Sequence, residues 1–192
     1  MSGMNNHTYR VNEIFYSLQG EGYNTGTAAI FVRFAGCNLR CAFCDTEHQS
    51  FTCMKASEIA SAVFGYSKDE HTLIVLTGGE PSLQVDSELL DALHAHHQKV
   101  AIETNGTTIL PDGIDWITVS PKQNTQIVQL WADEVKVVYE GQEVEHWLDD
   151  IIAKQYYLQP CSCKNTDEVI AYIKEHPEWR LSLQTHKYIG IQ

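Results

Sequence analysis

Short apolar runs alternate with amphipathic segments along most of this chain. A nearly continuous apolar run of roughly four to eight residues, such as residues 28–35, is typical of a strand that is buried on both faces in a parallel sheet. Apolar residues three or four positions apart instead indicate one buried face of a helix. The predicted strands span residues 10–17, 28–35, 72–76, 99–103, 115–119, 134–139, 156–159 and 180–184. The predicted helices span residues 55–64, 86–97, 143–153 and 166–175, and residues 185–192 form a short tail.

The alternation of strands and helices predicts parallel strands joined by right-handed crossovers. With 192 residues, the chain is shorter than the roughly 250 residues of a closed eightfold barrel. We therefore predict an α/β fold in the form of an incomplete parallel (β/α) barrel of the TIM type. The length also fits a single domain that spans residues 1–192.

The charge balance excludes some classes of partner. The formal net charge is −12, from 25 acidic and 13 basic residues, which argues against an extended nucleic-acid surface and against binding to an anionic membrane. The sequence contains no apolar run of about 18 residues, and Met1–Thr8 lack a signal-peptide core. We therefore predict a cytoplasmic protein that binds neither nucleic acid nor membrane.

The six cysteines are unevenly distributed. Three of them, Cys37, Cys41 and Cys44, lie within eight residues directly after the run 28–35, and long stretches without cysteine separate the others. Such bunching indicates metal or redox chemistry more often than a disulfide framework. The three thiolates could therefore bind one metal ion or cluster at the edge of the sheet.

A [4Fe–4S] cluster is the metal centre that these three thiols favour. Such a cluster normally takes four cysteines, so three leave one iron open to another ligand. The amino and carboxylate groups of S-adenosylmethionine suit that open position. The alternative is a zinc site, which would need Cys53 or His48 as a fourth ligand.

Conspicuous residues follow several other predicted strands. In parallel barrels the active site lies beyond the carboxyl ends of the strands, so these segments predict one site. Adjacent glycines would let the backbone approach a ligand closely, and Glu80 or a carbonyl could accept a hydrogen bond from an ammonium group. The segments are Thr77-Gly78-Gly79-Glu80, Glu103-Thr104-Asn105-Gly106, Ser120-Pro121-Lys122 and Gln159-Pro160-Cys161-Ser162.

The cysteine spacing, with Phe43 directly before Cys44, resembles the motif of the radical S-adenosylmethionine superfamily. The resemblance implies that the cluster and the cofactor, not a side chain, generate a reactive radical. It also implies that the loop segment Phe43-Cys44-Asp45 borders the cofactor's adenine. Gly79 and Glu80 would then lie at its methionine amino group.

A narrower resemblance covers nearly the whole chain. The matching segments occur in the same order in the 7-carboxy-7-deazaguanine synthase family, which the sequence resembles. Those segments are Leu18–Gly22, Phe31–Arg33, Cys44–Thr46, Thr77–Pro81, Glu103–Gly106, Ser120–Lys122 and Gln184–Gly190. The resemblance implies a lyase that converts 6-carboxy-5,6,7,8-tetrahydropterin to 7-carboxy-7-deazaguanine with loss of ammonia, in queuosine and 7-deazapurine biosynthesis. It also implies Mg²⁺ as a further cofactor.

The family resemblance implies roles for individual residues. Thr46 would bind Mg²⁺, and residues 120–122 and 159–162 would hold the adenosyl part of the cofactor. Residues 1–27 would form an extension that contacts the substrate, and residues 185–192 would cover the active site. The substrate contacts would be Leu18, Gln19, Gly20, Arg33, Thr77, His186 and the C-terminal Gln192.

Arg33 leaves two interpretations open. A cation on a buried strand is costly unless it is paired, and a substrate carboxylate offers a bidentate partner. An internal ion pair with an aspartate or glutamate would satisfy it equally well.

The resemblance further implies a homodimer and an electron donor such as flavodoxin or ferredoxin. Two other classes of function stay open. One is a small activase that generates a glycyl radical on a protein partner, and the other is a zinc or electron-transfer module without catalytic activity.

Overall fold

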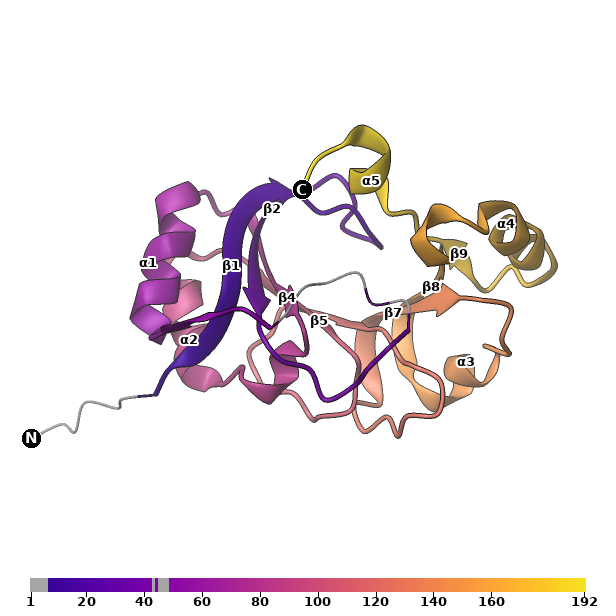
Figure 1. Ribbon diagram of the computed structural model, residues 1–192, viewed down its shortest axis with the longest axis horizontal. Helices are drawn as coiled ribbons and strands as arrows, with labels where there is room; N and C mark the ends of the chain where they lie inside the picture. The colour runs from indigo at the N-terminus through magenta and orange to yellow at the C-terminus, as the bar shows by residue number, and fades with distance from the viewer. Residues whose placement is uncertain (1–6, 43, 45–48) are drawn as a thin grey trace, which may run out of the picture.

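The computed structural model describes residues 7–42, 44 and 49–192, and a single nine-stranded sheet organises this part of the chain (Figure 1). The strand order is β3-β1-β2-β4-β5-β6-β7-β8-β9. The strands are β1 (Tyr9–Leu18), β2 (Ala28–Phe34), β3 (Thr52–Met54), β4 (Leu73–Gly78), β5 (Val100–Thr104), β6 (Trp116–Val119), β7 (Trp131–Tyr139), β8 (Ile152–Pro160) and β9 (Arg180–Leu181). The helices are α1 (Ala56–Tyr66), α2 (Ser87–Leu93), α3 (His146–Asp150), α4 (Thr166–Glu175) and α5 (Thr185–Ile189), with short 3-10 turns at Pro81–Leu83, His94–His96 and Cys161–Cys163.

The predicted incomplete barrel is confirmed. Every neighbouring pair of strands from β2 to β9 is parallel. The sheet keeps two free edges, at β3 and β9, and does not close into a barrel. Its helices α1 and α2 lie against the first half of the sheet, and α3 and α4 lie against the second half (Figure 1).

Several local predictions are wrong. β1 pairs with β2 in antiparallel fashion because residues 19–27 form a tight connection with no crossover helix. The three-residue strand β3 was not predicted, since so short an edge strand has no readable periodicity. The helix predicted over residues 143–153 ends at Asp150, because the Ile152 backbone N–H donates to the Leu130 carbonyl (3.0 Å) and begins β8. The last predicted strand is reduced to Arg180–Leu181.

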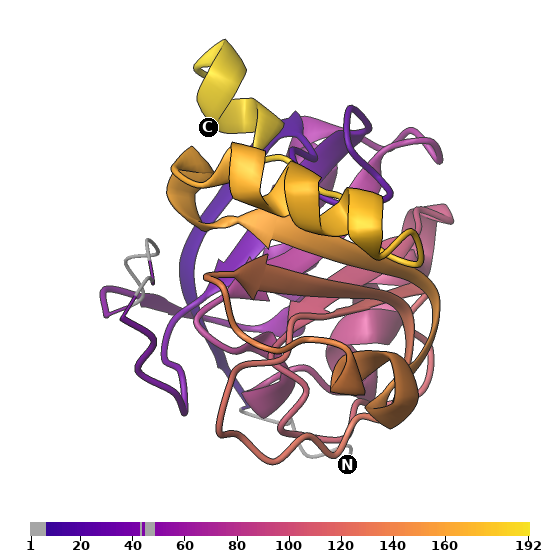
Figure 2. The same cartoon turned by 90° about the vertical axis from the view of Figure 1, so that its right-hand side faces the viewer.

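Alternate residues of the strands face two different environments. One set, which includes Ile30, Leu76 and Ile102, is fully buried in the main apolar core beneath the helices. α4 covers this outer face at β8 and β9 (Figure 2). The other set faces the concave side, where a small apolar cluster around Phe31 and Val75 gives way to polar residues toward the carboxyl ends of the strands. The alternation thus separates a structural face from a face that can bind ligands.

The β1–β2 connection crosses the open side of the sheet. The Gly22 N–H donates to Ser182 Oγ (2.9 Å) and the Tyr23 N–H donates to Glu134 Oε2 (2.8 Å). The Thr185 N–H donates to the Gly20 carbonyl (2.9 Å), so the C-terminal segment with α5 lies beside this connection (Figure 2). None of the helices in the described ranges has the length and apolarity needed to cross a lipid bilayer.

Candidate active site

The carboxyl ends of the parallel strands surround a cavity of about 440 Å³. The cysteine loop, the β1–β2 connection and the C-terminal segment complete its wall. The predicted site residues that line it are Leu18, Gln19, Gly20, Arg33, Cys37, Cys41, Cys44, Thr77, Gly79, Glu80, Ser120, Lys122, Gln159, Pro160, Cys161, Ser162, His186 and Gln192. Of the predicted site residues that the structure describes, only Pro121 is not in the wall. Phe43, Asp45 and Thr46 lie outside the described residues.

Two glycines bring the cysteine loop against the end of β4. The Gly79 N–H donates to the Phe34 carbonyl (2.9 Å), and the Glu80 N–H donates to the Gly36 carbonyl (2.8 Å). A Cβ on Gly79 would lie 2.0 Å from the Gly36 oxygen, and one on Gly78, whose φ is +117°, would lie 2.3 Å from the Phe34 oxygen. Only glycine allows this approach of two backbone segments.

The three cysteines of the loop form no disulfide and line the same cavity. Burial raises the pKa of the Cys37 thiol, although the Leu39 N–H donates to its sulfur at 3.4 Å. Within residues 7–42, 44 and 49–192, no three His, Cys, Asp or Glu side chains are gathered closely enough to hold a metal ion. The donor set nevertheless fits an iron–sulfur cluster, because three thiols from one loop leave a fourth iron open to the cavity.

Asn38, which was not predicted as a site residue, ties the cysteine loop to the end of β5. Its side-chain oxygen accepts from Asn105 Nδ2 (3.0 Å), and its Nδ2 donates to Thr107 Oγ1 (2.8 Å). The loop is therefore held from two sides, by the backbone of β4 and by these amides.

Glu80 is almost completely buried and is engaged within the protein. Its Oε1 accepts from the Ser82 N–H (3.0 Å) and from Thr104 Oγ1 (2.6 Å), and its Oε2 accepts from the Asn105 N–H (2.7 Å). The carboxylate thus joins the ends of β4 and β5. Acceptance from a cofactor ammonium, which was predicted for Glu80 or a carbonyl, stays a prediction.

The predicted adenosyl segments lie at the ends of β6 and β8. Lys122 Nζ donates to both the carbonyl and the Oγ of Ser120 (2.7 Å each), and burial lowers the pKa of Lys122. At β8, Gln159 Oε1 accepts from Ser182 Oγ (2.9 Å). Burial, followed by the charge of Glu140, raises the pKa of Cys161.

Arg33 lines the cavity and is also paired inside the protein. Its guanidinium donates to Glu13 and lies over the Phe15 ring (5.3 Å to the centroid). Glu13 in turn accepts from Gln192 Nε2 (2.9 Å), and Ser17 Oγ donates to the Gln192 carbonyl (2.6 Å). The internal ion pair, one of the two interpretations open from the sequence, is present, and the position of Arg33 in the cavity wall leaves the other possible.

Gln19 and Gly20 begin the β1–β2 connection, and His186 packs on Gly20. Gln19 Nε2 donates to Glu103 Oε1 (2.8 Å), and Gln19 Oε1 accepts from the Glu21 N–H (3.1 Å). The His186 ring packs so closely on Gly20 that a Cβ there would lie 2.2 Å from its Nδ1.

A buried ion network beside Gln19 was missed in the sequence. Lys136 Nζ lies 2.6 Å from Glu21 Oε2 and 3.2 Å from Glu103 Oε2. Burial alone would raise the pKa of Glu21, but the charge of Lys136 lowers it to about 2. Burial would lower the pKa of Lys136, but Glu103 and Glu21 raise it. A lysine inside the apolar run 134–139 was the available signal, since a buried cation needs a partner.

The match to a family model gives the class of protein. The model of the radical SAM superfamily matches residues 31–130, which contain the cysteine loop and strands β4 to β6. This match agrees with the open parallel sheet and with three cysteines outside disulfides at its carboxyl edge. The domain is therefore that of a radical SAM enzyme.

Comparison with individual proteins narrows the class. The chain is 54% identical over 183 residues to a 7-carboxy-7-deazaguanine synthase of Bacteroides thetaiotaomicron, with 95% of this chain and 98% of the relative covered. It is 41% identical to the synthase of Nitratidesulfovibrio vulgaris, with 96% and 99% covered. The crystal structure of QueE from Escherichia coli matches with a TM-score of 0.78 and 31% identity over 93% of this chain and 95% of that one. The chain belongs to the 7-carboxy-7-deazaguanine synthase family.

Proposed function

We propose that this protein converts 6-carboxy-5,6,7,8-tetrahydropterin to 7-carboxy-7-deazaguanine, with loss of ammonia, in queuosine and 7-deazapurine biosynthesis. One observation carries the proposal. A single cavity joins the three cysteines of the loop to Arg33 and to the β1–β2 connection. A radical source and a binding region for a carboxylated substrate would therefore share one cavity.

The cysteine loop is the cofactor end of this cavity. Cys37, Cys41 and Cys44 would hold a [4Fe–4S] cluster, which together with S-adenosylmethionine supplies hydrogen-atom abstraction through a 5′-deoxyadenosyl radical. Gly79 leaves the backbone accessible close to the loop, and the segments at Ser120–Lys122 and Gln159–Ser162 offer hydroxyl and backbone groups to the adenosyl part.

The opposite end of the cavity would hold the pterin. Arg33 can bind a substrate carboxylate in bidentate fashion once it shares or exchanges its bond to Glu13. Leu18, Gln19 and Gly20 present backbone and amide groups, which can match the paired donors and acceptors of a pterin ring.

The other members of the substrate end come from β4 and from the chain terminus. Thr77 contributes a hydroxyl, and His186 and Gln192 close the wall from the C-terminal side. We assign Thr46 as the protein ligand of Mg²⁺, which keeps several ligands from outside the protein.

The organisation of the chain supports one domain over residues 1–192. The β1–β2 connection and the C-terminal segment bond to each other above the cavity, so the extension 1–27 and the tail 185–192 both act as parts of the site. We further propose a homodimer in the cytoplasm, where thiols stay reduced, with flavodoxin or ferredoxin as the electron donor.

The deciding experiment is anaerobic reconstitution with iron and sulfide, followed by an assay with S-adenosylmethionine, the tetrahydropterin, Mg²⁺ and a reductant. We expect about four irons and four sulfides per chain and formation of 7-carboxy-7-deazaguanine. Cys41→Ala should lose the cluster and the product. Cys53→Ala, which alters an exposed thiol on β3, should keep the cluster and the product. Cofactor cleavage without the deazapurine would refute the substrate assignment, and bound zinc without sulfide would refute the enzyme assignment.

A further inference from the structure

Lys136 is a cation on the concave face of β7 in the wall of the cavity, and its side chain is only 4% exposed. It contacts two carboxylates that come from distant parts of the chain. Glu21 belongs to the β1–β2 connection, and Glu103 lies at the end of β5. The ammonium group is therefore one of the points at which the connection is held to the sheet.

The two carboxylates are held symmetrically. On Glu21, one oxygen accepts from Lys136 and the other accepts from Gln184 Nε2 (2.9 Å). On Glu103, one oxygen accepts from Lys136 and the other accepts from Gln19 Nε2 (2.8 Å). One lysine thus pairs with both carboxylates, and an amide binds the other oxygen of each.

Without Lys136, the Glu21 and Glu103 carboxylates, whose side chains are 16% and 23% exposed, would lie close together with no cation between them. Two like charges at short distance repel each other, and each carboxylate would also lose a charge-assisted hydrogen bond. Glu103 would then turn away from the direction in which its oxygens can accept from the amino and ring N–H groups of a pterin.

We propose that Lys136 is a positioning residue for the substrate: it directs the Glu103 carboxylate as an acceptor in the cavity wall and fixes the β1–β2 connection, with Gln19, across the open sheet. The proposal deepens the proposed function and rests on it. Lys136 acts through Glu103 and Gln19, and it takes no part in generating the radical.

Other titratable groups face the same network. Glu134, two residues before Lys136, accepts from the Tyr23 N–H, and burial raises its pKa. The charges of Lys122 and His186 also act on the network. The Kd values of the variants and of the wild type are therefore compared at a single pH.

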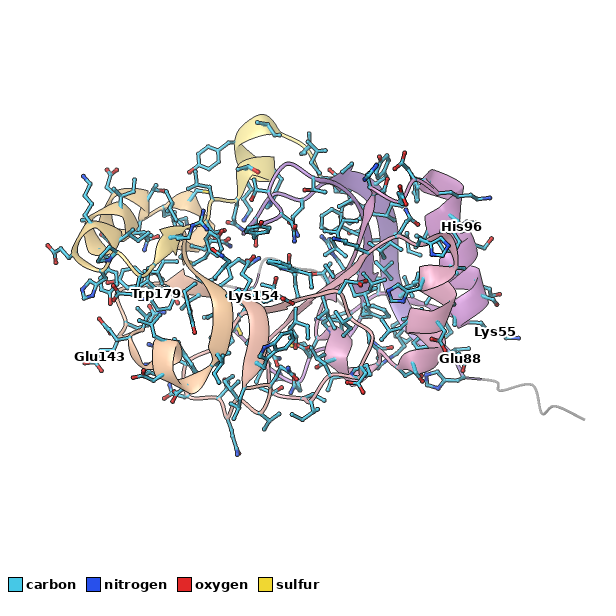
Figure 3. The ribbon with its side chains drawn as sticks, turned by 180° about the vertical axis from the view of Figure 1, so that it is seen from behind. Lys55, Glu88, His96, Glu143, Lys154 and Trp179 are labelled. Carbon is cyan, nitrogen blue, oxygen red and sulfur yellow. The ribbon has the colours of Figure 1, made fainter. Side chains whose placement is uncertain are left out.

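The test measures the Kd of 6-carboxy-5,6,7,8-tetrahydropterin by titration of the reconstituted enzyme loaded with S-adenosylmethionine, without reductant. We compare the wild type, Lys136→Met and the double variant Lys136→Met/Glu21→Gln, which removes one positive and one negative charge. The matched control is Lys154→Met on β8 (Figure 3), since Lys154 pairs with the buried Asp133 (2.7 Å) but its side chain is 64% exposed and outside the cavity wall.

We expect Lys136→Met to raise this Kd by about tenfold at pH 7.5, because Glu103 loses the charge-assisted hydrogen bond that directs its carboxylate. The double variant should also bind weakly, since Glu103 still lacks its cation. Iron content, the spectrum of the cluster and the affinity for S-adenosylmethionine should match those of Lys154→Met.

Two outcomes would overturn the proposal. They are an unchanged Kd in Lys136→Met and a double variant that binds like the wild type, which would mean that Lys136 only balances Glu21. If Lys136→Met does not fold, the double variant alone decides. A wild-type protein that does not bind the pterin would instead refute the proposed function.

Discussion

Replacement of Glu80 by alanine should destabilise the protein strongly, even though the side chain is small and lies beside a cavity. The carboxylate is 1% exposed and accepts from the backbone N–H groups of Ser82 and Asn105 and from the hydroxyl of Thr104. Each buried donor that is left unpaired costs about 1–3 kcal/mol. Water from the adjacent cavity can replace part of this loss, so we expect a decrease of about 4 kcal/mol in the free energy of unfolding.

A chain of this size loses roughly 2–4 °C in Tm for each kcal/mol, so Glu80→Ala should lower the Tm by roughly 8–16 °C. The Tm of Glu80→Gln should lie between those of the wild type and Glu80→Ala. The amide oxygen still accepts a hydrogen bond, but the amide nitrogen faces another donor. The assay is thermal unfolding of the metal-free protein by circular dichroism. Glu143→Ala, at an exposed site after β7 (Figure 3), is the control and should change the free energy of unfolding by less than about 0.5 kcal/mol.

The same variants should affect the cofactor end of the site. Glu80 holds the end of β4 to the end of β5, and the Glu80 N–H also donates to the Gly36 carbonyl before the cysteine loop. We therefore expect less iron in Glu80→Ala after reconstitution. A Tm within 2 °C of the wild type, at about the accuracy of such a measurement, would refute the view that this carboxylate is a structural clamp.

Three further predictions concern the loop, the ion network and the tail. Gly79→Ala should prevent cluster incorporation, because its Cβ would lie 2.0 Å from the Gly36 oxygen, whereas Gly65→Ala in α1 has nothing within 4 Å and should leave iron content unchanged. Equal iron content in both variants would contradict the packing argument. The pKa of Glu21 is lowered from 4.5 to about 2, so its contribution to stability is present above pH 4.5 and is lost as the pH falls toward 2. The difference in unfolding free energy between the wild type and Glu21→Gln should shrink over that range in acid titrations. A constant difference would mean that ionised Glu21 does not stabilise the folded protein. Deletion of Gln192 removes two hydrogen bonds at the surface, so it should change the free energy of unfolding by less than about 1 kcal/mol while it raises the KM for the pterin; an unchanged KM would remove the tail from the substrate site.

Most strands could be predicted because a strand that is buried on both faces has apolar residues at consecutive positions in the sequence. The run at β2 is apolar over consecutive positions, and so are the runs at β4 and β5. Boundaries were less predictable where local pattern and tertiary contact disagree. Residues after Asp150 continue a helical pattern, yet Ile152 pairs with Trp131 of β7.

The location of the site could also be predicted, for a geometric reason. Parallel strands place their carboxyl ends on one edge, so the segments after β2, β4, β5, β6 and β8 had to meet. The structure gathers them around one cavity, as expected. The hydrogen-bond and ion-pair partners of those side chains could not be inferred, because they depend on which residues lie close together in the folded structure.

By itself, the sequence determined the open α/β architecture, the cysteine loop as a metal-binding motif and the family, since these depend on short segments and their order. Only the tertiary structure decided that the β1–β2 connection crosses the sheet, that Glu80 turns inward and that Arg33 pairs with Glu13. It also decided the partner of Lys136, because Glu21 lies 115 positions away in the chain. Local periodicity reports burial, but an ion pair across such a separation exists only once the sheet has formed.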